Sequence, residues 1–222
     1  MAIGDVRAVL RYVPLFRGRI FVVVFDEGLL PEPAVAETLL DLHALQSIGV
    51  QLVIGVLGGG VDDLANRATE LEIKFAPVEA GPGVAGCVED CREILGRGQA
   101  VLVDCRGNRS FDPEVFGLAG ALRAAKLIAL VNGVGVLREG APLHAVAVAE
   151  AKLLAAGGAV DGASLLAGAA AACESGIPRV HVLDGRVQGV LADELFSNEG
   201  VGTMVHTDAY EEIRVLRDED VP

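Results

Sequence analysis

The sequence has no tryptophan, only three lysines and few aromatic residues, which make up 4% of its 222 positions. Its charge is strongly one-sided: Asp and Glu number 31 against 18 Lys and Arg, giving a formal net charge of -13, and no basic run occurs. Proteins that bind nucleic acid use several cations to neutralise phosphates. We therefore expect no nucleic-acid partner.

Long hydrophobic runs are also missing. Apolar stretches such as residues 20–25 are much shorter than the roughly 20 residues that span a bilayer. The first residues, Met-Ala-Ile-Gly-Asp, have neither the basic nor the apolar region of a signal peptide. We expect a cytoplasmic protein that does not contact a membrane.

Cysteine is sparse, with residues at positions 87, 91, 105 and 173. Cys87 and Cys91 would share one face of a helix, but a metal site would need two more ligands, and no CxxC motif or His cluster supplies them. We expect buried thiols in a reducing compartment and no metal.

Hydrophobic residues, at 52%, and 28 glycines are abundant. The apolar residues form runs of four to eight bounded by Gly, Pro and Asp, which is typical of buried parallel strands between helices. The sequence predicts an α/β fold, a three-layer αβα sandwich with a mainly parallel central sheet. Strands are expected at 20–25, 51–56, 100–104, 126–131, 179–183, 203–206 and 213–216. Helices are expected at 5–13, 33–48, after Gly60, and at 88–95, 112–125, 143–156, 163–174 and 188–196.

Three parts of the chain are distinguished by this pattern. Residues 1–18 hold the first helix, which should end at Pro14 and whose apolar face needs a cover. Residues 19–208 form the main domain, and residues 209–222 form a tail. Gly58, Gly59 and Gly60 follow the second strand directly. They indicate either a tight turn or a site for an anion or carboxylate at a helix N-terminus.

Two segments near the C-terminus carry a family resemblance. Arg-Val-His-Val-Leu-Asp-Gly-Arg at 179–186 and Glu-Leu-Phe-Ser-Asn-Glu-Gly-Val-Gly-Thr-Met at 194–204 closely resemble the signature of acetylglutamate kinases and of the kinase-like domain of acetylglutamate synthases. Residues 10–19 look like the entry to the first strand in arginine-sensitive members. The resemblance implies the amino-acid kinase (carbamate kinase-like) fold with an appended N-terminal helix, shortened between Ile73 and Gln99.

Kinase chemistry needs cations and glycine-loop amides around the transferred phosphoryl group. Where family kinases carry Lys-x-Gly-Gly after the first strand, this chain reads Val-Phe-Asp26-Glu27. The second catalytic lysine of the family should lie near Leu165, and its Thr-Asp pair is here Val131-Asn132. The resemblance therefore implies a domain without catalytic residues or a cofactor, which serves as the regulatory and oligomerising part of an acetylglutamate synthase. The competing hypothesis is a kinase that uses arginines as substitute cations, namely Arg17, Arg106 or Arg109.

Asp112 matches an aspartate that organises the active site in relatives, and it is also placed to cap a helix ahead of Pro113. In arginine-sensitive relatives the inhibitor sits near the C-terminal signature, beneath the N-terminal helix. The resemblance thus implies an L-arginine site in which Glu194 contacts the guanidinium. Its other residues would be Tyr12, His181, Gly200, Gly202 and Thr203.

Each of these residues also has a structural reading. Glu194 can be a solvated helix residue, His181 a core histidine, and the glycines can serve a turn with positive φ. Relatives assemble through the N-terminal helix, so a homo-oligomer is expected. Residues 213–222 resemble the start of a GNAT-type acetyltransferase domain, or are an ordinary strand with an acidic tail. A third hypothesis is a structural paralogue that acts only through assembly.

Overall fold

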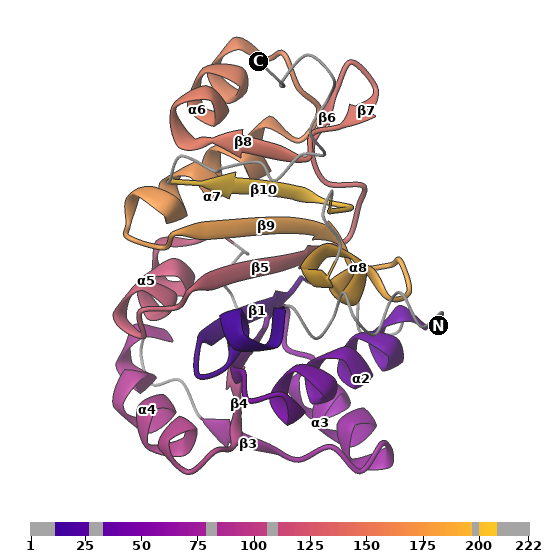
Figure 1. Cartoon of the computed structure of the whole chain (residues 1–222), viewed down its shortest axis with the longest axis vertical. Coiled ribbons are helices and arrows are strands. Elements are labelled where there is room, and N and C mark those ends of the chain that lie inside the picture. The colour runs from indigo at the N-terminus through magenta and orange to yellow at the C-terminus, as the bar shows by residue number, and fades with distance from the viewer. Residues whose placement is uncertain (1–11, 27–32, 79–83, 106–110, 197–199, 208–222) are drawn as a thin grey trace, which may run out of the picture.

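The computed structural model describes residues 12–26, 33–78, 84–105, 111–196 and 200–207. Its main feature is an eight-stranded sheet in the order β3-β4-β2-β1-β5-β9-β10-β8 (Figure 1). Neighbouring strands are parallel except for β9 and β10. The strands are β1 (Ile20–Phe25), β2 (Gln51–Val56), β3 (Phe75–Val78), β4 (Ala100–Asp104), β5 (Lys126–Val131), β8 (Ala145–Ala147), β9 (Arg179–Asp184) and β10 (Thr203–His206).

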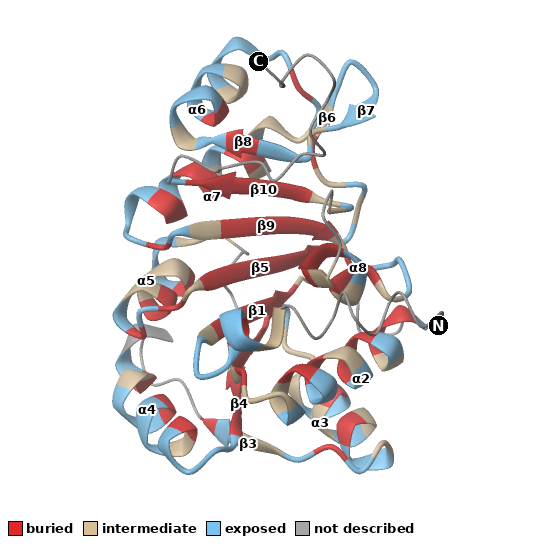
Figure 2. Cartoon of the chain, viewed as in Figure 1, coloured by how far each residue is buried: buried red, intermediate tan, exposed pale blue. Residues whose placement is uncertain are grey.

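Helices cover both faces of this sheet, so the predicted three-layer α/β sandwich is confirmed. One face packs against α2 (Ala34–Ser47), α3 (Val61–Glu70) and α8 (Val190–Phe196). The other packs against the helices α4 (Val88–Gly96), α5 (Pro113–Ala121), α6 (Val148–Gly157) and α7 (Ala163–Glu174), with the short 3-10 turn η1 (Val84–Cys87). The central strands are buried on both sides (Figure 2), which explains their unbroken apolar sequences.

The largest departure from the predicted elements lies between β5 and α6. The predicted helix at 143–156 begins only at Val148. Before it, β6 (Leu137–Arg138) and β7 (Ala141–Pro142) form a hairpin, and β8 pairs with β10 at the sheet edge. Pairing across the sheet outweighs the helical preference of this alanine-rich stretch, because intrinsic propensity is weak relative to tertiary contacts.

Smaller corrections concern element ends. Strand β3 was not predicted. It is a short edge strand whose Pro77 is tolerated because an edge strand leaves one row of backbone groups unpaired. The helix expected to end at residue 125 ends at Ala121. Two residues later Arg123 takes a φ of 55°, which lies outside the right-handed helical region.

The N-terminal helix was predicted to end at Pro14, but the helical turn covers residues 12–16 and is closed by the bond from Arg17 N to the Val13 carbonyl. The rest of that helix and the strand expected at 213–216 lie outside the described residues. No helix in the described ranges has the length and hydropathy to cross a membrane.

Helix α7 lies close to Phe111, which precedes α5, and depends on a glycine for this contact. A Cβ added at Gly168 of α7 would stand 2.6 Å from Cβ of Phe111, just before α5. A Cβ at Gly117 of α5 would meet nothing within 4 Å. The close approach of α7 to Phe111 therefore needs Gly168, whereas Gly117 has no such role.

We predict opposite effects for two matched substitutions. Gly168→Ala should lower the free energy of unfolding by about 1–3 kcal/mol, because the added methyl group would overlap Phe111 and push it away from α7. Gly117→Ala should raise it by about 0.5–1 kcal/mol, because alanine favours the helix. Urea unfolding followed by far-UV circular dichroism measures both. A stabilising Gly168→Ala would contradict the contact.

Candidate functional site

The candidate site is built around the turn between α8 and β10, where two glycines are required for different reasons. Gly200 has a φ of 67°, and a Cβ on it would lie 2.9 Å from Oε2 of Glu194. A Cβ on Gly202 would lie 2.2 Å from Leu183 Cδ2 and 2.6 Å from the Val182 carbonyl oxygen. The turn therefore lies tightly against β9 and around the Glu194 side chain.

The turn closes around the side chain of Glu194, a residue of α8. That side chain is 4% exposed. Oε2 accepts hydrogen bonds from the backbone N–H groups of Val201 at 2.7 Å and Gly202 at 2.9 Å. Oε1 lies 2.7 Å from Nδ1 of His181. Glu194 is therefore neither a solvated residue nor exposed to a ligand in this structure: both of its oxygens bond to the protein.

His181 also contacts a lysine through its second ring nitrogen. Nε2 of His181 lies 2.9 Å from Nζ of Lys126, the first residue of β5. An ammonium group can only donate, so Nε2 accepts this bond, and Nδ1 carries the proton that is donated to Glu194. A cation and an anion are thus joined through a neutral imidazole, and all three side chains are buried.

The pKa values agree with this assignment. Burial, the nearby charge of Lys126 and that of Arg179 lower the pKa of His181 to about 4 despite its contact with Glu194. Burial would raise the pKa of Glu194, but the bonds from His181, Gly202 and Val201 lower it to about 2. Burial and the charge of Arg179 lower the pKa of Lys126 to about 8. At neutral pH the three groups are therefore ammonium, neutral imidazole and carboxylate.

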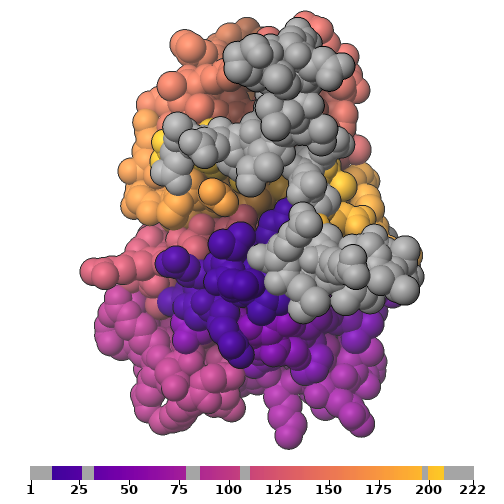
Figure 3. Space-filling view, viewed as in Figure 1, coloured from indigo at the N-terminus to yellow at the C-terminus, as the bar shows by residue number. Residues whose placement is uncertain are grey.

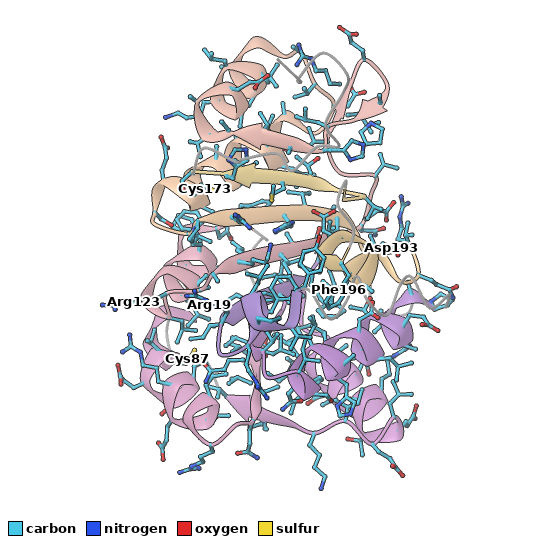
Figure 4. The ribbon with its side chains drawn as sticks, viewed as in Figure 1. Arg19, Cys87, Arg123, Cys173, Asp193 and Phe196 are labelled. Atoms are coloured by element: carbon cyan, nitrogen blue, oxygen red, sulfur yellow. The ribbon has the colours of Figure 1, made fainter. Side chains whose placement is uncertain are left out.

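An aromatic cluster joins the N-terminal segment to α8 beside these groups. The ring of Tyr12 stacks on Phe16 at a centroid distance of 5.6 Å and meets the edge of Phe196 at 5.9 Å. Nζ of Lys126 lies 5.8 Å from the centroid of Phe16 and 5.9 Å from that of Phe21. Figure 4 shows Phe196 on the face of the sheet that carries the N-terminal segment, which Figure 3 shows in indigo.

A second carboxylate holds the beginning of α8. Oδ2 of Asp41, on α2, accepts the N–H of Ala192 at 3.2 Å. Burial and the charges of Glu37 and Asp193 raise the pKa of Asp41 to about 6, although the hydrogen bond opposes this shift. Helix α8 is therefore fixed near its start by α2 and near its end by His181 and the glycine turn.

The structure brings together most of the residues predicted for an amino-acid site. His181, Glu194, Gly200 and Gly202 are in direct contact or in one turn, and the buried Thr203 begins β10 opposite Val182. Tyr12 contacts Phe196, at the end of the helix that holds Glu194. Their role in binding arginine stays a prediction.

The predicted substrate positions belong to another part of the fold. Gly58 and Gly59, with φ values of 72° and 88°, and Gly60, the N-cap of α3, follow the carboxyl end of β2. Asp112 occupies the N-cap position of α5, ahead of Pro113. Among the residues that the structure describes, no group of three or more His, Cys, Asp or Glu side chains could hold a metal ion.

Two residues of this candidate site were not predicted from the sequence. Lys126 begins a strand whose other residues are all apolar, and a charged residue in such a strand must find a buried partner. That was an available signal. Asp41 gave none, because its place on an amphipathic helix looks like that of any solvated residue, and its partner at Ala192 is 151 residues away.

No protein-family model matches the chain. An acetylglutamate kinase from Methanococcoides burtonii is 34% identical to it over 117 residues, which are 49% of this chain and 38% of the kinase. An amino-acid acetyltransferase from Neisseria meningitidis serogroup B is 34% identical over 105 residues, 47% of this chain and 24% of that protein. The chain is similar in sequence to acetylglutamate kinases and amino-acid acetyltransferases. The match spans well under half the length of either relative.

Solved structures show the same fold. N-acetylglutamate synthase from Neisseria gonorrhoeae, complexed with coenzyme A and N-acetyl-glutamate, superposes over 100% of this chain and 67% of its own, with a TM-score of 0.80 and 20% identity. The same enzyme with coenzyme A and L-arginine gives 0.77. Carbamate kinase from Giardia gives 0.62 over 86% of this chain, with 10% identity. The chain has the fold of these amino-acid kinase-like proteins.

The buried His181 and Glu194 should make the protein sensitive to acid. Between about pH 4 and 6.5 an unfolded histidine binds a proton that folded His181 does not, and between about pH 2 and 4.5 the same holds for Glu194. At these two groups the unfolded state binds more protons, so their contribution to the free energy of unfolding falls as the pH is lowered. Asp41, with its pKa raised to about 6, contributes in the opposite sense between about pH 4 and 6. From pH 7 to 4 the His181 contribution is on the order of 3 kcal/mol.

His181→Gln should remove the His181 contribution, so that lowering the pH from 7 to 4 reduces the free energy of unfolding less than in the unmodified protein, although the substitution also lowers stability at pH 7. The matched control is His43→Gln, because His43 is exposed on α2 and its replacement should leave the slope unchanged. Urea titrations followed by circular dichroism between pH 4 and 7 suit a chain without tryptophan. An equally steep slope in His181→Gln would refute the assignment.

Proposed function

We propose that this chain is a kinase-like domain without phosphoryl-transfer activity, which responds to L-arginine as the regulatory part of an N-acetylglutamate synthase of arginine biosynthesis. The observation that carries the proposal is the assembly of His181, Glu194 and the glycine turn beneath Tyr12. The motif that resembles arginine-sensitive relatives forms one connected group of side chains and backbone amides.

The strand ends support the absence of kinase activity. In this type of fold, ligands bind at the carboxyl ends of the strands. Asp26 follows β1 and is fixed there by its N–H bond to the Leu130 carbonyl, in a region where a kinase would need cations and bare backbone amides. Leu165 packs against the apolar core, and Asn132 follows β5. None of these side chains can supply a positive charge.

The competing kinase hypothesis relied on substitute arginines. Arg17 precedes β1 and packs along Gly49, just before β2, so it lies at the amino ends of the strands, opposite the expected phosphoryl site. It is therefore a poor substitute. Arg106 and Arg109 lie outside the described residues.

Arginine binding is supported by the resemblance of the turn and by the solved synthase complex with L-arginine. The aromatic rings of Tyr12 and Phe196 beside the turn are surfaces on which a guanidinium group stacks well. Assembly is part of the same proposal. Leu15, at the end of the N-terminal helix, is 63% exposed, so this segment presents apolar surface to a second copy.

We expect L-arginine to give a saturable heat in isothermal titration calorimetry, and L-citrulline, which has the same shape without the charge, to give none. Glu194→Gln should weaken arginine binding at least tenfold, because it removes the charge that orders the turn. Glu70→Gln, on the exposed side of α3, is the matched control and should bind normally. Circular dichroism checks that both variants fold. If millimolar arginine gives no specific heat with the unmodified protein, the arginine part of the proposal is wrong.

A coupled assay for ADP tests the kinase hypothesis. With ATP and N-acetylglutamate we expect no ADP above the protein-free background. Turnover that disappears in Arg106→Ala or Arg109→Ala, while Arg123→Ala stays active as a surface control, would overturn the proposal in favour of a kinase with substitute cations.

A further inference from the structure

Three of the four cysteines lie together in the core on the α4 side of the sheet. Cys87 ends η1, Cys91 lies one turn further in α4, and their Sγ atoms are 3.9 Å apart. Cys105 follows β4, and its charge, like that of Cys87, helps to raise the pKa of Cys91. Cys173 lies apart from Cys87, on α7 (Figure 4). Its thiol donates a hydrogen bond to the Val205 carbonyl at 3.4 Å.

The two neighbouring thiols of α4 are not equivalent. The hydrogen bond from Cys91 lowers the pKa of Cys87 against the effect of burial, whereas the same bond and burial raise the pKa of Cys91. Cys87 is also the N-cap residue of α4, where the helix dipole favours a negative charge. Burial raises the pKa of Cys105 and of Cys173 to about 12. Cys87 is therefore the cysteine best placed to react as a thiolate.

The two sulfurs are close but not yet at bonding distance. A disulfide holds its sulfurs about 2.05 Å and its Cβ atoms about 3.5–4.5 Å apart, whereas residues four apart in a helix have Cβ atoms about 5–6 Å apart. Bond formation therefore needs a backbone shift at η1, where Cys87 lies, in addition to rotation of the two side chains. Both thiols are buried, with exposures of 1% and 0%. A reagent must therefore enter through local opening of η1, a single turn whose Gly86 is already exposed.

We propose that Cys87 and Cys91 form a reversible dithiol–disulfide site that hydroperoxides oxidise. The Cys87 thiolate attacks the peroxide oxygen, which releases an alcohol or water and leaves a sulfenic acid on Cys87. The Cys91 thiol then attacks that sulfur, and water leaves as the disulfide forms. Two thiols lose two electrons and two protons, and the peroxide takes them up. The site lies on the opposite face of the sheet from Glu194 and does not depend on the proposed function.

Trypsin separates the cysteines cleanly, because cleavage after Lys74 and Arg92 leaves Cys87 and Cys91 alone in the peptide 75–92. After hydrogen peroxide treatment of the folded protein, denaturation and alkylation, this peptide should lose two hydrogens and take up no alkyl group. Dithiothreitol should reverse the change. The peptides with Cys105 and Cys173 should remain fully alkylated.

Variants make the test specific. Cys91→Ser should abolish the loss of two hydrogens, whereas Cys173→Ser, the matched control, and Cys105→Ser should leave it unchanged. The proposal is overturned if peptide 75–92 still takes up two alkyl groups, if it becomes linked to the Cys105 peptide instead, or if Cys173 is oxidised as fast. Because the bond would lie within one turn, arginine binding should be the same in both redox forms.

Discussion

A carboxylate buried in the protein interior is stable only when its charge is fully hydrogen-bonded, and Glu194 meets this condition with groups from separate parts of the chain. The amides of the turn come from the approach to β10 and the imidazole from β9. Through that imidazole the carboxylate is linked to Lys126 on β5. Removing it would leave two N–H groups and a buried histidine without their acceptor, each at a cost of about 1–3 kcal/mol. One side chain thus fixes the position of α8, the turn and two central strands.

This network also connects the N-terminal segment to the rest of the domain. The ammonium of Lys126 lies near the rings of Phe16 and Phe21, and Phe16 in turn contacts Tyr12 and Phe196. A change in the charge or position of Glu194 could therefore alter the packing of residues 12–16 through a short chain of direct contacts. This contiguous group of polar and aromatic side chains joins the turn to the N-terminal segment, which is the kind of connection that the proposed function would use.

The sequence predicted the central strands well, because strands buried on both faces leave unbroken apolar runs between glycine and proline. It failed where an element is defined by its partner. Strand β8 exists because β10 lies beside it, and Asp41 caps Ala192 only after α2 and α8 have come together. The candidate residues His181, Glu194, Gly200 and Gly202 were found through a motif, but their mutual contacts were not. A neutral histidine between a lysine and a glutamate has no signature in the sequence.

The contacts of Glu194 also bear on how an amino acid would be recognised. A guanidinium that bound this carboxylate directly would have to reach a side chain that is 4% exposed and that already accepts three hydrogen bonds, one from His181 and two from the amides of Val201 and Gly202. A ligand that contacts the outer side of the same turn, and the rings of Tyr12 and Phe196, displaces none of them. The glycines are needed for the turn itself, since a side chain at position 202 would overlap Leu183. For the arginine binding proposed above, these contacts favour a role for Glu194 in holding the turn in place over direct contact with the guanidinium.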